Sequence, residues 1–143
     1  MSVRFMAAYE ARKHECQLHP HAESLLAGLT AAGLTHSVLS AYELNLLTTT
    51  LAQYNLSRHF IKTCGGSDIH AGSKEERARR HLADLAVHPE EVIYIGDTAH
   101  DAEAAAAMGV DCVLVAHGHQ HRDRLTGAGV RVVESFAELT AEL

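Results

Sequence analysis

Several residue types are scarce in this chain of 143 residues, and each scarcity excludes a class of protein. The three cysteines are widely spaced and form no Cys-x-x-Cys pair, so neither a disulfide framework nor a structural zinc site is expected. Twelve basic residues against eighteen acidic ones give a net charge of −6, which disfavours nucleic-acid binding. No apolar run approaches the ~20 residues of a membrane span, and no secretory signal is recognisable. We therefore expect a soluble, cytoplasmic globular protein that binds neither nucleic acid nor membrane.

Apolar runs alternate with amphipathic stretches from about residue 20 onward. The strands are expected over 35–40, 59–64, 92–96, 111–115 and 131–133, and the helices over 21–33, 42–55, 74–86, 101–108, 121–127 and from 135. This alternation, with short connections, predicts an α/β fold: a doubly wound parallel sheet with helices on both faces. Residues 1–18 do not fit it and are expected to form a separate helical segment, followed by an α/β core over 19–143.

Two carboxylates stand where the most apolar strand ends. Asp97 directly follows the strand 92–96, and Asp101 lies four residues later on the first helical turn. Because ligands of such sheets bind at the carboxyl ends of the strands, this pair is a candidate site for Mg²⁺, which prefers oxygen ligands. The pattern is equally typical of a helix N-cap, in which Asp97 or Thr98 caps and Asp101 favours the positive end of the helix.

Two further candidates lie at the same edge of the predicted sheet. Ser40 ends the strand 35–40, where a hydroxyl and the amides that follow it can hold a phosphate oxygen. Lys74 begins the helix that precedes the strand 92–96 and could supply a point charge to phosphate. Taken alone, Ser40 is more often a simple helix cap and Lys74 a solvated surface residue.

In this order, Ser40, Lys74 and the passage Gly96-Asp97-Thr98-x-x-Asp101 resemble the motifs of the haloacid dehalogenase-like (HAD) hydrolases. The likeness is greatest to members similar to phosphoglycolate phosphatase and covers nearly the whole chain. It implies a Rossmann-like core and Mg²⁺-dependent phosphoryl transfer from a small phosphorylated metabolite. By the same resemblance, Ser40 and Lys74 stabilise the phosphate, Asp97 is the direct Mg²⁺ ligand with Asp101 behind it, and residues 1–18 are the remnant of a helical cap.

The family's first motif, a strand followed by Asp-x-Asp near the N-terminus, has no counterpart in this chain. Its six aspartates are residues 68, 84, 97, 101, 111 and 123. The resemblance makes the first aspartate of that motif the nucleophile, and removing a nucleophile typically costs on the order of 10⁶-fold in rate, by analogy with a serine protease. We therefore expect a shortened or degenerate phosphatase of little or no activity. The alternatives are a non-catalytic phosphate- or metal-binding module and, less well supported, a receiver-like domain.

The strand that carries the absent motif is central in the related fold. Its loss would leave the strands 35–40 and 92–96 with exposed edges, which promote aggregation. The two strands could pair directly, the segment 3–6 could fill the gap, or a second chain could cover it, so a homo-oligomer is expected.

Three histidines follow the strand 111–115 in alternation: His117, His119 and His121. In an extended segment they could chelate a transition metal, although solvated loop histidines are the more ordinary interpretation.

Overall fold

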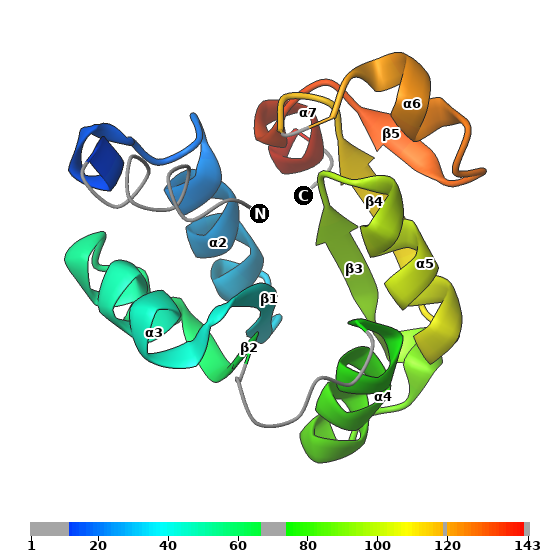
Figure 1. Cartoon of the computed structure of the whole chain (residues 1–143), viewed down its shortest axis with the longest axis horizontal. Coiled ribbons are helices and arrows are strands. Elements are labelled where there is room, and N and C mark those ends of the chain that lie inside the picture. Colours follow the sequence, from blue (N-terminus) through cyan, green and yellow to red (C-terminus); the bar gives the residue numbers. More distant parts are fainter. Residues whose placement is uncertain (1–11, 67–73, 119, 142–143) are drawn as a thin grey trace.

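A computed structural model describes residues 12–66, 74–118 and 120–141, and its elements follow the expected alternation (Figure 1). In chain order they are η1 (Lys13–Glu15), α2 (Ala22–Ala31), β1 (His36–Glu43), α3 (Leu44–Gln53), η2 (Ser57–His59), β2 (Phe60–Gly66), α4 (Lys74–Leu85), η3 (Pro89–Glu91), β3 (Ile93–Gly96), α5 (Ala99–Met108), β4 (Asp111–Val115), α6 (Arg122–Thr126), β5 (Arg131–Val133) and α7 (Phe136–Thr140). Within the described ranges, no helix is both long and apolar enough to cross a membrane.

The strands are all parallel, as predicted, but they form two sheets. One sheet pairs β1 with β2, and the other has the order β3-β4-β5. Of the three ways of closing the gap that the sequence left open, direct pairing of β1 with β3 is not found, since among the described strands β1 pairs with β2 and β3 with β4. The other two ways of filling the gap between β1 and β3 stay open. The segment 3–6 lies outside the described residues, and covering of the gap by a second chain remains a prediction.

The three-stranded sheet has helices on both faces because the side chains of β4 alternate between them. Leu114 points to one face and packs with Ala102 of α5 and Leu125 of α6. Val113 and Val115 point to the other face and pack with Val133 of β5 and with α7. This covering on both faces is the one that a doubly wound fold requires.

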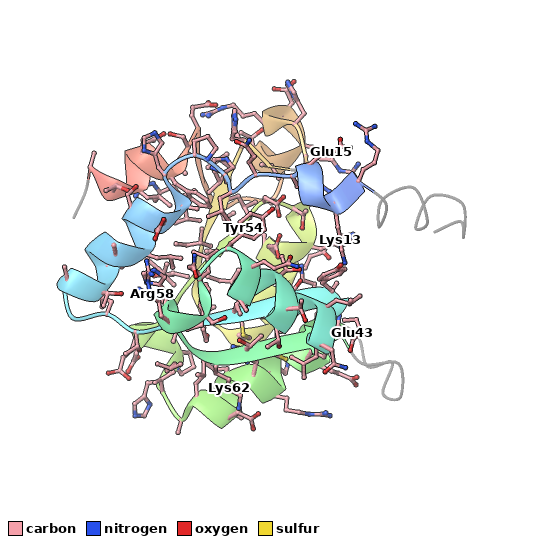
Figure 2. The ribbon with its side chains drawn as sticks, turned by 90° about the vertical axis from the view of Figure 1, so that its left-hand side faces the viewer. Lys13, Glu15, Glu43, Tyr54, Arg58 and Lys62 are labelled. Atoms are coloured by element: carbon pink, nitrogen blue, oxygen red, sulfur yellow. The ribbon has the colours of Figure 1, made fainter. Side chains whose placement is uncertain are left out.

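The two-stranded sheet has its own apolar core. Leu47 and Leu51 of α3 pack with Leu56, and residues of α2, β1 and β2 surround them. Helix α4 contacts β1 as well, through the hydrogen bond of His81 to Ser37 (3.0 Å). In Figure 2 this half of the molecule, on the left of Figure 1, faces the viewer. The two sheets are thus built around separate apolar clusters.

Strand β3 departs from the expected burial. Its continuous apolar sequence is typical of a strand buried on both faces, yet Ile93 is 60% exposed and Ile95 is 36% exposed. Both point to the face on which α7 packs against β5, and this face of β3 is left partly exposed. Among the described strands, β3 pairs with β4 alone, so it is an edge strand of the described sheet and has a partly exposed apolar face.

Candidate functional site

Strand β3 ends at a turn in which two glycines make room for two carboxylates. A Cβ added to Gly96 would collide with the side chain of Asp101, and one added to Gly118 would collide with that of Asp97. Gly118 belongs to the loop after β4, which ends beside β3 because the two strands pair in parallel. The two glycines thus allow the backbone to pass directly beside the side chains of Asp97 and Asp101, where a larger residue would not fit.

Asp101 is buried, only 7% exposed, and its carboxylate accepts five hydrogen bonds from the described part of the chain. Its Oδ1 accepts from Lys74 Nζ (2.6 Å) and from the Tyr94 hydroxyl (3.2 Å). Its Oδ2 accepts from the amide of Asp97 (3.2 Å), the amide of Thr98 (2.9 Å) and the Thr98 hydroxyl (2.7 Å). Asp101 therefore holds the turn and the Lys74 ammonium in place, as the acidic residue of a capping box does at the start of α5.

Burial and nearby charges shift the pKa values of Asp101 and of two of its neighbours. Burial alone would raise the pKa of Asp101, but the hydrogen bonds from Lys74 and Thr98 lower it below the ordinary value. Burial and the Asp101 charge raise the pKa of the Tyr94 hydroxyl. The same two causes raise the pKa of the Cys112 thiol to about 11. At neutral pH, Asp101 is ionised, whereas Tyr94 and Cys112 stay protonated.

Asp97 lies at an open pocket of about 280 Å³. The pocket is lined by His19, Ile95, Gly96, Asp97, Val115, Gly118 and Phe136. A carboxylate that lines an open pocket fits Mg²⁺, which is usually held by one or two carboxylates and keeps several waters. The donor chemistry of the site thus agrees with a hard divalent cation at Asp97, whereas the oxygens of Asp101 are occupied by protein donors.

Ser40 lies on the other sheet. It stands inside β1, which continues to Glu43, so the expectation that Ser40 ends its strand is wrong. Its Oγ accepts a hydrogen bond from the Tyr42 amide (3.1 Å). Helix α3 is capped by Glu43, whose carboxylate accepts from the amides of Asn45 and Leu46, so Ser40 is not the cap either. The structure thus brings Lys74, Asp97 and Asp101 together, with Ser40 in the carboxyl-terminal half of β1.

The histidine loop shows no metal centre in the part of the chain that is described, where no group of three or more potential ligands gathers. The His117 ring packs edge-on against that of His19, with 4.9 Å between ring centroids. His121 caps α6 by accepting from the Asp123 amide (3.4 Å). His119 lies outside the described residues.

Two site residues were not identified from the sequence. Tyr94 could have been found, because residues two apart on a strand share a face and Tyr94 therefore lies on the same face as Gly96, toward α5. Gln120 gave no signal in the sequence. Its side-chain oxygen accepts from the Ala99 amide (2.9 Å) and so joins the loop after β4 to the start of α5.

Known proteins are similar to this chain in sequence. The chain is 31% identical over 139 residues to the tyrosine-protein kinase PtkA of Mycobacterium tuberculosis, covering 96% of this chain and 48% of the relative. It is 28% identical over 126 residues to a phosphoglycolate phosphatase of Yersinia pestis, covering 86% of this chain and 54% of the relative. The chain thus spans about half the length of the curated relatives it matches.

Solved structures agree with the fold. The crystal structure of a predicted phosphatase from Clostridium acetobutylicum superposes with a TM-score of 0.81 at 25% identity, covering 86% of this chain and 58% of that one. Residues 1–115 match the family described as haloacid dehalogenase-like hydrolase. With most of its length matching that family and its fold shared with phosphatases, the chain belongs to the haloacid dehalogenase-like hydrolases.

Proposed function

We propose that this chain carries the phosphate- and metal-binding part of a phosphomonoester hydrolase site that acts with Mg²⁺ on a small phosphorylated metabolite. The observation that carries the proposal is the Lys74–Asp101 ion pair beside Asp97 at the end of β3, with side chains that are 25% and 10% exposed. An ammonium and two carboxylates held at the carboxyl end of a parallel strand form a site for a phosphate together with its cation.

Each residue has a distinct role in this proposal. Asp97 would hold Mg²⁺, and Asp101 would position Lys74 and the turn rather than bind the cation. Lys74 and Ser40 would stabilise the negative charge of the phosphoryl group, Lys74 by its charge and Ser40 by its hydroxyl. The chemistry supplied by a bound Mg²⁺ is polarisation of the phosphoryl oxygens.

The chain lacks an aspartate nucleophile, and this sets the expected rate. No aspartate precedes Asp68 in the sequence. No aspartate therefore stands near the N-terminus, where the family's nucleophile would accept the phosphoryl group. Hydrolysis by the chain alone should be weak or absent. This observation favours a second candidate function, a non-catalytic module that binds phosphate or metal.

Turnover of an aryl phosphate by the purified chain, with and without Mg²⁺, tests the proposal. We expect negligible turnover from the 143 residues alone. A strand ending in Asp-x-Asp, added by fusion or as a partner chain, should restore Mg²⁺-dependent turnover that Asp97→Asn abolishes. Restored turnover that is insensitive to Asp97→Asn would contradict the role of Asp97. Robust turnover by the unmodified chain that Asp97→Asn abolishes would show that another group supplies the nucleophile.

A further inference from the structure

Helix α4 carries a second cation close to Lys74. Arg77 follows Lys74 by three residues, and residues three apart on a helix lie on the same face. Both side chains are half-buried, whereas Arg79 and Arg80 are exposed. Arg77 therefore points inward together with Lys74.

The Arg77 side chain reaches the end of the two-stranded sheet. Its Nη1 lies 3.4 Å from the point that a Cβ on Gly66 would occupy, and the carbonyl oxygen of Ala41 lies 2.7 Å from the same point. Gly66 is the last residue of β2, and Ala41 directly follows Ser40 on β1. Arg77 thus lies beside the strand of Ser40, while Lys74 on the same helix reaches Asp101 beside β3.

The charge of Arg77 has no counterion within the described residues. Its neighbour Lys74 pairs with Asp101, and Arg79 donates to the carbonyl of Ala107. The Nε atom of Arg77 is buried, and it makes no hydrogen bond to the described part of the chain. A guanidinium N–H removed from water without an acceptor is unfavourable, so an anion that reaches Arg77 would be bound strongly.

We propose that Arg77 is a phosphate-binding residue, which supplies its guanidinium to the phosphate that Lys74 and Ser40 bind. The planar guanidinium matches two oxygens of one phosphate, which the compact lysine ammonium cannot do. This assignment rests on the function proposed above and adds to it a cation that links the Ser40 strand to the Lys74–Asp101 pair.

Calorimetric titration of the full chain with inorganic phosphate tests the assignment, using Arg77→Gln, Lys74→Gln and the matched control Arg80→Gln. The control removes the same charge from an exposed residue of the same helix. We expect the dissociation constant to rise about tenfold or more in Arg77→Gln and to stay within about twofold in Arg80→Gln. Arg77→Lys should recover part of the affinity, because it keeps the charge without the planar fork.

Thermal unfolding separates a binding role from a structural one. Arg77→Gln removes an unpaired charge, so the variant should unfold no lower than the wild type without phosphate, and phosphate should raise the Tm of the wild type more than that of the variant. A lower phosphate-free Tm with unchanged phosphate affinity would show that Arg77 is structural and would overturn the assignment.

The titration also separates this inference from the proposed function. If Lys74→Gln weakens phosphate binding and Arg77→Gln does not, the assignment of Arg77 is wrong and the proposed function stands. If the wild type does not bind phosphate at millimolar concentrations, the proposed phosphate site is wrong, and Arg77 has no role there.

Discussion

At the scale of single residues, Asp101 is the most constrained side chain of the site. It stabilises the start of α5, the turn after β3 and the position of the Lys74 ammonium at once. Because these interactions share one carboxylate, they are coupled, and losing it leaves Lys74 without a partner in the half-buried site.

Asp101→Asn should lower the free energy of unfolding by about 2–4 kcal/mol, as measured by urea denaturation at pH 7. Asp111→Asn, which removes an exposed carboxylate at the start of β4, should cost less than about 0.5 kcal/mol. Equal effects of the two substitutions would show that the Asp101 network contributes little to stability.

The same residue sets a pH dependence. The pKa of Asp101 is lower in the folded chain than its ordinary value of 3.8, so its stabilisation is complete above that value and is lost as the pH falls through the folded pKa. Wild-type stability should therefore fall more steeply than that of Asp101→Asn as the pH drops below about 4. If the wild type and Asp101→Asn lost stability with the same slope in acid, the lowered pKa assigned to Asp101 would be contradicted.

Much of the site could be predicted at this scale, because the local sequence shows where a strand ends and which residues follow it. Asp97 and Asp101 follow an unmistakable strand, and the N-cap interpretation also describes Asp101, whose carboxylate binds the amide of Thr98. Ser40 was misplaced because β1 continues past it with an irregular ladder, which no local pattern indicates. Arg77 was not identified either, because its environment depends on Gly66, eleven residues away.

At the scale of elements, α4 joins the two sheets. It contacts α5 on the side of the three-stranded sheet and β1 on the side of the two-stranded sheet. Toward β1, its buried His81, 5% exposed, bonds to Ser37, and Asp84 pairs with Lys62 of β2 (2.7 Å). The position of Lys74 at the start of α4 therefore depends on contacts made two and three turns further along the helix.

His81 makes this contact sensitive to pH. Burial, and next the charge of Lys62, lower the pKa of His81 below 6.5, while Asp84 acts in the opposite direction. The unfolded chain therefore takes up the proton first, and stability should decrease as the pH falls below about 6.5. His81→Gln should lose less stability than the wild type between pH 7.5 and pH 5 in urea denaturation.

The matched control is His100→Gln, which removes an exposed histidine on α5 and should reduce the pH dependence less than His81→Gln does. His36 has a lowered pKa as well, from burial and next from the charge of His59, so the wild-type decrease should be reduced by His81→Gln rather than abolished. If His81→Gln and His100→Gln gave the same profile, protonation of His81 would not control the α4 contact.

At the scale of the whole molecule, the alternation of apolar runs predicted the parallel strands. The absence of the family's first motif predicted unpaired edges at the strands 35–40 and 92–96, where the described strands divide into two sheets. Pairing depends on which strands become neighbours, and the apolar pattern of Ile93 and Ile95 would fit a central strand as well as an edge strand. These two isoleucines are exposed because α7 packs against β5 and leaves this face of β3 partly open, which is a property of the assembled fold.

The exposed face of β3 predicts self-association. An exposed apolar edge strand tends to pair with another chain, so we expect a dimer or larger assembly by light scattering at micromolar concentrations. Ile93→Lys should shift the population toward monomer, whereas Leu34→Lys, at a 53% exposed position outside the strands, should not. A well-folded wild-type monomer throughout that range would contradict this prediction.

The separate apolar clusters of the two sheets have a consequence for how the chain opens. Segments with their own cores can unfold one at a time, and native-state amide hydrogen exchange detects each as a distinct free energy of opening. Amides of β1, β2 and α3 should share one value, and those of β4, β5 and α5 another. A single value common to both groups would mean that α4 and the contact of α2 with α7 couple the two halves into one cooperative unit.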